Sequence, residues 1–498
     1  LVAAGIDVHT LPYSEPFGPL GNVMGLPERE VALHWDGREI VKRLAPAEFR
    51  GDFVRCRIAV SFVTGGAEVT VELGEGKPYD RFFVPGMLPY GKRVAVGAGT
   101  RSDATTQFDV QDLRFDDNRP ETTHRAPLRF ELFNHVLTDN KKTAYEAEVD
   151  LPPAEWAFGR VLLTLEIHDA GKDWDEWDRN GEISVYDAEG VKRGIVPFIT
   201  SYRTPCHLLF VVTHFRALLD AKTRFEIAAE TTFYKNRGYM MSAVLDFYPG
   251  APDLVPYRVV PLWHGTARYR SDENHFKDFF EPRTVAIDPH AKAVKVWTTT
   301  TGHSQVGEFT PSKRVLVCGE ARFEDTLWRT DCYLNPNRPQ FGTWKYPRAG
   351  WAPGDVVRPW WVDLTPHVEP GATVEIRYEP RPYEFPEGRR PDDKEIAVAT
   401  HVVRSYLILY REPDGLMAPP ALLVTGVADG SSAAKAGLKP GDWLATYDGK
   451  PLETIENLRD AIRGAEGKES VRVAAYRGTE RLEVEMPPGT MGVNLAAR

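Results

Sequence analysis

Two distant segments of the chain contain residue types that could act together on one small chemical group. Residues 174–179, Trp-Asp-Glu-Trp-Asp-Arg, bring carboxylates, an arginine and tryptophans into one short stretch, and residues 347–354 add Arg348 and Trp351. A carboxylate can transfer protons, an arginine can polarise an amide oxygen, and a tryptophan can stack on the face of a sugar. We therefore expect the two segments to form one site that suits a carbohydrate-linked amide.

The elements that must position these segments have the pattern of β-strands. Apolar and polar residues alternate over residues 68–73 and 373–378, as they do in a strand with one buried face. Helical periodicity is scarce, and 41 glycines and 39 prolines indicate many turns between short strands. The sequence thus predicts an all-β protein built from antiparallel sandwiches.

Several domains are expected, because one hydrophobic core cannot serve a chain of 498 residues. Polar stretches and turns rich in proline and glycine separate four pieces. The pieces are a β-rich N-terminal domain over 1–126, a first β unit over 127–252, a second β unit over 253–412 and a small domain over 420–498.

The bulk composition argues against some functions. A net charge of -10 makes nucleic acid an unexpected partner. The sequence contains no run of 18 apolar residues, so no membrane span is predicted. The four cysteines form no Cys-x-x-Cys pair, which argues against a zinc site. Cys318 and Cys332 could close a disulfide loop or remain buried thiols, and the sequence leaves both alternatives open.

The C-terminal piece has a different pattern, in which strands alternate with short helices. Thr454 is expected to cap a helix that runs to Ile462, with Gly464 ending it. A strand, a short helix, a second strand and a hairpin are expected before it, over residues 421–427, 432–438, 443–447 and 448–452. This order resembles a PDZ domain of the bacterial kind.

The resemblance implies a peptide-binding groove in this domain. A PDZ domain holds a peptide carboxylate in a loop of backbone N–H groups that precedes an apolar strand, and only residues 488–495 fit this description. We therefore expect a permuted arrangement, in which a peptide C-terminus adds as a strand. The groove residues would be Met491, Gly492, Val493 and Leu495, facing the helix over 455–462. Alternatively, the groove is empty or covered by the chain's own tail.

Residues from about Phe130 to Tyr410 resemble the peptide-N-glycosidase F family of N-glycan amidases. The resemblance rests on many short matches in one order. The matching segments are residues 176–179, 198–202, 212–219, 227–231, 301–303, 307–309, 335–336 and 348–354. The half-cystines of the family are mostly missing, so we expect its loop cross-links to be lost and replaced by packing or by the first domain.

This resemblance implies two antiparallel jelly-roll sandwiches side by side, with the active site in the cleft between them. It implies catalytic roles for three carboxylates, Asp178, Glu308 and Glu230. It also implies substrate or water contacts from Arg179, Arg348, Trp351 and Trp177. Without the family, Asp178 and Arg179 form an ordinary surface ion pair and Glu230 faces solvent. Either tryptophan could be a core residue, and this alternative is favoured for Trp177 over Trp351.

The implied reaction is hydrolysis of the Asn side-chain amide that carries the first N-acetylglucosamine of an N-linked glycoprotein or glycopeptide. Asp178 would take a proton from water and return it to the nitrogen, while Arg348 would stabilise the oxyanion. Arg179 would keep Asp178 ionised or in position, Glu308 would hold a second water or orient the amide, and Glu230 would bind the sugar. No metal or other cofactor is implied. A secreted or periplasmic protein whose signal peptide has been removed is expected.

Two other function classes remain open. The chain could be an inactive glycan-binding or scaffold protein that recruits partners through its PDZ domain. A copper monooxygenase could also use tandem jelly rolls, but it needs clustered histidine and methionine ligands. The 13 histidines are scattered along the sequence, so this alternative ranks last.

Overall fold

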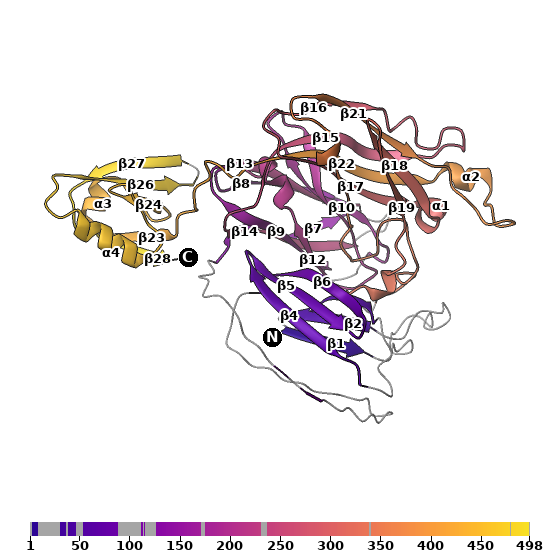
Figure 1. Cartoon of the computed structure of the whole chain (residues 1–498), viewed down its shortest axis with the longest axis horizontal. Coiled ribbons are helices and arrows are strands. Elements are labelled where there is room, and N and C mark those ends of the chain that lie inside the picture. Colours follow the sequence, from indigo (N-terminus) through magenta and orange to yellow (C-terminus); the bar gives the residue numbers. More distant parts are fainter. Residues whose placement is uncertain are drawn as a thin grey trace. The chain divides into compact units, whose positions relative to one another are not determined.

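The computed structural model describes residues 2–7, 30–35, 38–45, 53–87, 111–112, 114, 126–170, 175–230, 237–337, 340–478 and 480–497. Trp174 of the first chemical segment lies outside them. The chain divides into two compact units, Leu1–Arg125 and Ala126–Arg498. Strands dominate both units (Figure 1).

The first unit contains two three-stranded antiparallel sheets, in the orders β1-β2-β3 and β4-β5-β6. Alternation along β5 sends Ala67, Val69, Val71 and Leu73 into its core, which explains the two-residue period of this segment. The strands are β1 (Val2–Asp7), β2 (Glu30–Trp35), β3 (Arg38–Leu44), β4 (Cys56–Val63), β5 (Gly66–Leu73) and β6 (Gly76–Pro85).

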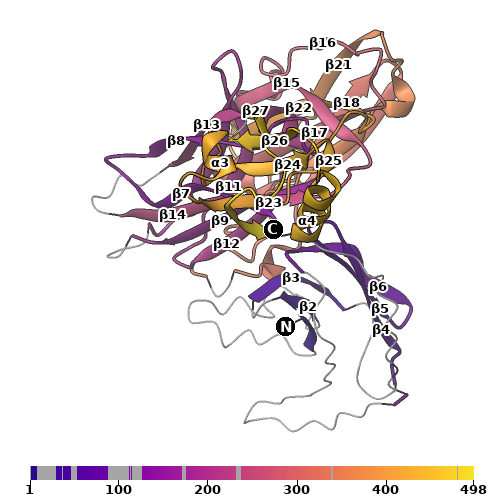
Figure 2. The same ribbon diagram turned by 90° about the vertical axis from the view of Figure 1, so that its left-hand side faces the viewer.

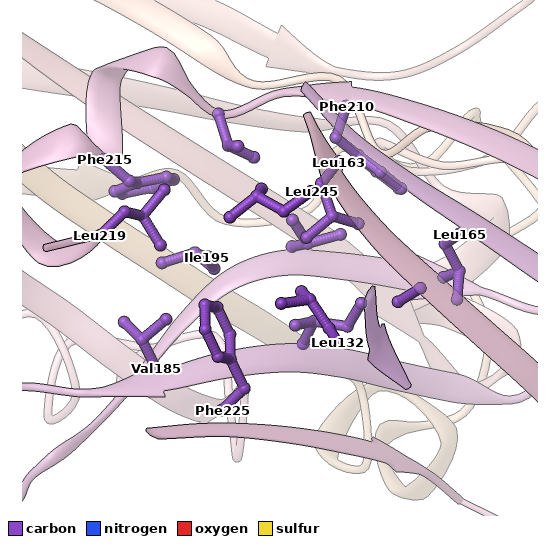
Figure 3. Close-up of a cluster of buried hydrophobic side chains, with 14 of the residues drawn as sticks. Leu132, Leu163, Leu165, Val185, Ile195, Phe210, Phe215, Leu219, Phe225 and Leu245 are labelled. Carbon is purple, nitrogen blue, oxygen red and sulfur yellow. The ribbon is translucent and has the colours of Figure 1, made fainter. Parts of the chain in front are cut away.

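The second unit begins with a sandwich of two four-stranded antiparallel sheets, β11-β10-β13-β8 and β12-β9-β14-β7. Leu132, Leu163, Phe225 and Leu245 are among the side chains that fill the space between its sheets (Figure 3). The strands are β7 (Leu128–Asp139), β8 (Ala144–Asp150), β9 (Phe158–Asp169), β10 (Asn180–Tyr186), β11 (Lys192–Ile199), β12 (Cys206–Val211), β13 (Lys222–Ala229) and β14 (Gly238–Pro249).

A second sandwich follows, with sheets in the orders β15-β22-β17-β20 and β16-β21-β18-β19. Counted from its own first strand, it repeats the strand order of the first sandwich, and this order is that of a jelly roll. The strands are β15 (Val255–Arg268), β16 (Arg283–Ala286), β17 (Ala293–His303), β18 (Ser312–Cys318), β19 (Ala321–Leu327), β20 (Trp360–Asp363), β21 (Thr373–Pro380) and β22 (Thr400–Arg411).

Two strands of the second sandwich have both faces buried. Val296 on β17 and Leu407 on β22 belong to the core of the second sandwich, whereas Trp297 and Tyr406 belong to the core of the first. The sheet that contains β17 and β22 therefore lies between two cores. This position accounts for the continuous apolar runs along these strands, because a strand covered on both faces does not alternate.

Short helices occur in the connections of the two sandwiches. The α-helix α1 (Ser304–Phe309) follows β17 directly, and α2 (Asp393–Ala397) precedes β22. The 3-10 turns are η2 (Thr213–Leu218), η3 (Cys332–Leu334) and η4 (Thr365–His367).

The C-terminal domain has one antiparallel sheet in the order β27-β26-β24-β23-β28, with β25 paired to β24 (Figure 2). Thr454 caps α4 (Ile455–Gly464) through the N–H of Asn457, and the Asn457 side chain bonds back to Thr454. The helix therefore begins where predicted. The remaining elements are β23 (Leu422–Val427), α3 (Ser432–Lys435), β24 (Trp443–Tyr447), β25 (Lys450–Pro451), β26 (Val471–Arg477), β27 (Glu480–Met486) and β28 (Val493–Ala497).

The C-terminal domain packs on the start of the first sandwich. The rings of Trp156 and Tyr476 meet edge to face with centroids 4.9 Å apart. Met417 in the connecting segment exchanges backbone hydrogen bonds with Glu155 and Ala157, at 2.8 and 2.7 Å. The domain is thus joined to the sandwich by both packing and hydrogen bonds.

The predicted fold class is confirmed: antiparallel jelly-roll sandwiches dominate an all-β protein that ends in a small α+β domain. Within the described residues, no helix combines the length and the apolar character needed to span a membrane.

Candidate active site

Asp178 lies in a short connection between β9 and β10 whose shape is set by buried polar groups. Asp175 is fully buried, accepts a bond from the Trp177 N–H at 3.1 Å and pairs with Nε of Arg179 at 3.1 Å. Tyr239 donates to the Trp177 carbonyl at 2.9 Å. These bonds fix the backbone on both sides of Asp178, so the segment holds its carboxylate in place.

Arg179 forms its ion pair with Asp175 and not with Asp178. It still lies near enough for its charge to favour the ionised form of Asp178, although this is the smallest of the contributions to the pKa of that carboxyl. The expected role of Arg179, keeping Asp178 ionised or in position, stays a prediction, and the ion pair with Asp175 acts mainly on the shape of the loop.

Tyr202 links the two distant segments. Its hydroxyl donates to Oδ2 of Asp178 at 2.8 Å and accepts a long bond from Nη2 of Arg348 at 3.4 Å. It lies just beyond β11, and the backbone of Gly342 packs against its ring. Tyr202 belongs to one of the segments that match the family in order, but nothing in the local sequence shows that this tyrosine will bridge two segments.

Arg348 is completely buried, and all five of its N–H groups have acceptors. Nε donates to Oε1 of Glu308 at 2.7 Å, and Nη1 donates to the carbonyls of Thr343 at 2.7 Å and Tyr346 at 3.1 Å. Nη2 donates to the Thr343 hydroxyl at 2.9 Å and to Tyr202. No donor is left for a substrate carbonyl. The expected oxyanion role is therefore corrected to one of positioning Glu308 and Tyr202.

Glu308 on α1 and Asp178 form an electrostatically coupled pair of carboxyl groups. Burial raises the pKa of Glu308 to about 7; Arg348 opposes this rise, and the charge of Asp178 adds to it. Burial also raises the pKa of Asp178, against the opposing effects of Arg348 and of the hydrogen bond from Tyr202. Carboxyl groups with raised pKa values near a shared arginine can act as a proton acceptor and a proton donor near neutral pH.

The sequence favoured a core position for Trp177 and a substrate contact for Trp351, and the structure buries Trp351 and exposes Trp177. Trp351 is only 2% exposed; its indole N–H donates to the Gly302 carbonyl at 2.8 Å, and its ring lies 5.0 Å from the Arg348 guanidinium. It therefore supports Arg348 and cannot touch a sugar, which corrects the expected substrate contact. Trp177 is 51% exposed beside Asp178, so the alternative of a core position is wrong for it.

Glu230 lies beside the end of the segment that carries Asp178 and Arg179. It follows β13, is exposed, and its backbone N–H donates to the Asn180 carbonyl at 2.8 Å. In the described part of the chain its carboxylate makes no hydrogen bond or ion pair with Asp178 or Glu308. The structure thus links Asp178 and Glu308 through Tyr202 and Arg348, and it joins the backbone of Glu230 to Asn180, two residues after Asp178.

The loop between β19 and β20 that carries Arg348 is stabilised by ion pairs. Buried Arg329 bridges Asp331 at 3.1 Å and Asp355 at 2.7 Å, and Arg358 pairs with Asp331 at 2.7 Å. Arg329 and Arg348 also exchange backbone hydrogen bonds. This four-residue charge network holds the two ends of the loop together.

All four cysteines are free thiols, so the alternative of a disulfide between Cys318 and Cys332 is wrong. Cys332 is a buried residue of the same loop, and its thiol donates to the Trp351 carbonyl over 3.5 Å. Among the residues that the structure describes, no three histidine, cysteine, aspartate or glutamate side chains gather as a metal site would require.

In the C-terminal domain, β28 is an edge strand of the sheet and pairs with β23. Val493 and Leu495 are partly buried and, with Ile455 and Ile462 of α4, pack against the domain core, while Met491 is part of that core. Gly492 has a φ of +76°, and a Cβ there would lie 2.4 Å from Ser431. Val493 and Leu495 next to the exposed edge therefore border the same core as Ile455 and Ile462 of α4.

Fold and site define a class: a tandem jelly-roll protein with a partly buried carboxylate–tyrosine–arginine cluster and a small appended α+β domain. Comparison with known families agrees with it. Residues 273–408 match the family described as peptide-N-glycosidase F, C terminal, and residues 423–477 match the PDZ domain. The resemblances noted in the sequence are therefore confirmed.

Individual relatives are similar at low identity. The chain is 24% identical over 274 residues to peptide-N(4)-(N-acetyl-beta-D-glucosaminyl)asparagine amidase F of Elizabethkingia miricola, which covers 50% of this chain and 75% of that protein. A 63-residue stretch is 40% identical to the periplasmic pH-dependent serine endoprotease DegQ of Escherichia coli, 13% of this chain and 14% of the protease.

Solved structures are also similar. PNGase F from Flavobacterium meningosepticum has a TM-score of 0.47 at 21% identity, over 58% of this chain and 96% of that chain. A crystal structure of a peptide-N(4)-(N-acetyl-beta-D-glucosaminyl)asparagine amidase has a TM-score of 0.48 at 21% identity, over 57% and 96% of the two chains.

Proposed function

We propose that the two sandwiches hydrolyse the amide bond between asparagine and the first N-acetylglucosamine of N-linked glycoproteins or glycopeptides. The observation that carries the proposal is the partly buried pair of Asp178 and Glu308, joined through Tyr202 and Arg348. The similarity to an amidase that acts on this bond supports the substrate. The reaction releases the glycan as a glycosylamine and leaves aspartate in the peptide.

Asp178 acts as the general base. Its carboxylate accepts a hydrogen bond from Tyr202 on one oxygen, which leaves the second oxygen to take a proton from water. Burial raises its pKa and makes it a stronger base than an exposed aspartate, while the charge of Arg348 and the hydrogen bond from Tyr202 favour its ionised form. The activated water attacks the amide carbon.

Glu308 acts as the general acid. Its pKa of about 7 leaves a large share of the carboxyl protonated at neutral pH, so it can donate a proton to the amide nitrogen as the C–N bond breaks. This role differs from the water-holding role that the sequence suggested. Arg348 fixes Glu308 through its Nε and Tyr202 through its Nη2, so it controls the distance between acid and base.

The exposed ring of Trp177 next to Asp178 is the proposed stacking surface for the first sugar. Glu230 is exposed, and its backbone bonds to Asn180, two residues after Asp178, so its carboxylate is the proposed partner of a sugar hydroxyl.

The C-terminal domain binds a peptide C-terminus by adding it as a strand to β28. Such a domain recruits a partner or a substrate chain to the enzyme. The match of this region to a periplasmic protease supports a secreted or periplasmic location for the whole chain.

The reaction is tested by incubating a denatured N-glycoprotein with the protein in water enriched in heavy oxygen. The proposal predicts free glycan in solution, together with peptides in which the glycosylated Asn has become Asp and has gained one heavy oxygen. Glycan release with Asn retained would point instead to cleavage between sugars. Glycan binding without release at any pH would leave a glycan-binding scaffold protein.

A further inference from the structure

A small pocket lies at the end of β15, away from the carboxylate pair. It is lined by Arg268, Arg270, Ala397, Val398 and Thr400 and has a volume of about 350 Å³. Small-molecule sites range from about 300 to 1,000 Å³, so this pocket can hold a group the size of one sugar residue. No carboxylate belongs to its lining.

The charge of the pocket comes from two arginines. Arg268 is exposed and makes no ion pair with any residue that the structure describes. Arg270 pairs through Nη1 with Asp278 at 2.9 Å, which holds one edge of its guanidinium and leaves its other N–H groups for a ligand. Arg270 has a φ of +66°, and its backbone N–H bonds to the Ala397 carbonyl at 3.2 Å, so the chain is bent at this point against α2.

The lining defines the chemistry of a ligand. Two guanidinium groups favour a carboxylate or sulfate, which can accept bidentate hydrogen bonds. Val398, 61% exposed, and Ala397 provide an apolar wall for the carbon atoms of a sugar ring or an acyl group. The chain as a whole carries a net charge of -10, so this basic pocket is a local feature and does not reflect a basic surface in general.

The strand register connects the pocket to the candidate active site. Arg268 on β15 lies opposite Thr400 on β22, and Thr400 lies opposite His303 on β17. Residues directly opposite each other in antiparallel strands share one face of the sheet, so Arg268 and His303 are on the same face, about 10 Å apart across two strand spacings.

His303 in turn contacts residues that support Asp178 and Glu308. The His303 ring stacks on Trp351, with centroids 5.6 Å apart, and Trp351 lies under Arg348. On α1, the residue before Glu308 is Gly307, where a Cβ would lie 3.2 Å from the backbone of Thr400. The pocket is therefore within reach of an outer sugar of a glycan whose first sugar lies at Asp178 and Glu308.

We propose that this pocket binds an acidic sugar residue of the substrate glycan, with its carboxylate or sulfate on Arg268 and Arg270 and its ring on Val398. The proposal rests on the proposed amidase function for its biological setting. Such a pocket makes the enzyme selective for acidic over neutral N-glycans.

The first test compares two glycopeptides that differ only in their terminal sugars, one carrying carboxylated sugars and the other with these sugars removed enzymatically. Wild type is expected to show a higher kcat/KM on the acidic glycopeptide, and Arg268→Gln is expected to lower the ratio of the two values about tenfold. Arg459→Gln, which removes an exposed arginine on α4, is the charge-matched control and keeps the wild-type ratio. An unchanged ratio in Arg268→Gln would overturn the proposal.

The second test separates this inference from the amidase function, because it needs no turnover. A free carboxylated sugar, a sulfated sugar and a neutral sugar are titrated into the Asp178→Asn protein by NMR or calorimetry. Binding of either acidic sugar that weakens about tenfold in the Asp178→Asn, Arg268→Gln double variant supports the pocket even if no glycan is ever released. Absence of binding by both acidic sugars overturns it even if the amidase activity is present.

Discussion

At the scale of single residues, the account depends on two carboxyl groups whose proton affinities are set by burial and by one arginine. If Asp178 must be ionised and Glu308 protonated, kcat/KM follows a bell-shaped curve with pH. The basic limb falls near pH 7, where Glu308 loses its proton. We expect Glu308→Gln to lower kcat/KM about 100-fold and to remove the basic limb, because an amide cannot titrate. A basic limb that remains at the same pH in the variant would assign it to another group.

Glu308 also makes stability depend on pH. Its pKa rises from 4.5 in the unfolded chain to about 7 in the fold, so the folded state binds more protons between these values. The free energy of unfolding of the wild type should therefore fall as pH rises from 4.5 to 7, by roughly 2–3 kcal/mol from this group. Urea unfolding of wild type and Glu308→Gln at both pH values measures the difference. Equal pH slopes in the two proteins would contradict the raised pKa.

Tyr202 is the residue that the sequence did not assign, and its hydroxyl can be tested alone. Tyr202→Phe removes the hydrogen bond that favours ionised Asp178, so the pKa of Asp178 should rise further and the acid limb of kcat/KM should move up by about 1 pH unit. Tyr186→Phe is the matched control, because its hydroxyl also bonds to carboxylates but lies on β10, outside the cluster. A loss of rate without movement of the acid limb would indicate a merely structural role.

At the scale of elements, the loop between β19 and β20 depends on charge rather than on covalent cross-links. Removing the buried guanidinium in Arg329→Gln leaves Asp331 and Asp355 without their internal partner and should lower the free energy of unfolding by about 3–5 kcal/mol. Arg358→Gln removes an exposed arginine that pairs with the same two carboxylates. This change should lower the free energy of unfolding by less than about 1 kcal/mol. Similar costs in the two variants would show that the buried bridge does not stabilise the loop.

The free thiols give a separate prediction for the same loop. A reducing agent should leave both the melting temperature and the activity unchanged, since none of the four cysteines is in a disulfide. Differential scanning calorimetry with and without reductant measures this directly. A drop in melting temperature on reduction would reveal a cross-link and contradict the charge-based account.

Some of these elements and site residues could be predicted from the sequence, and others could not. Alternation predicts the strands over 68–73 and 373–378, which are found as β5 and β21, and cap residues predict α4, because these signals are local. Ordered matches identify the segments that carry Asp178, Glu308 and Arg348. The sequence cannot show which tryptophan is buried, since Trp351 and Trp177 differ only in what packs over them. It also cannot show that Arg348 uses all its donors internally, because its partners come from several loops.

At the scale of the whole molecule, the C-terminal domain is packed on the first sandwich and is not a free appendage. Tyr476→Ala removes the ring that meets Trp156 and should loosen this joint, so limited proteolysis should cut faster near residues 412–420. Tyr447→Ala, which alters the core of the domain itself, is the contrasting variant and should unfold the domain instead. Equal cleavage of wild type and Tyr476→Ala near these residues would mean that the contact does not hold the domain.

The central claim is that Asp178 is the base of an N-glycan amidase, and the most direct measurement is the rate of glycan release by wild type and by Asp178→Asn. The variant keeps the size of the side chain and an acceptor for the Tyr202 hydroxyl, so the site should retain its shape. We predict release by wild type and a loss of at least about 100-fold in the variant, with glycopeptide binding retained. Release at the wild-type rate by Asp178→Asn would contradict the account.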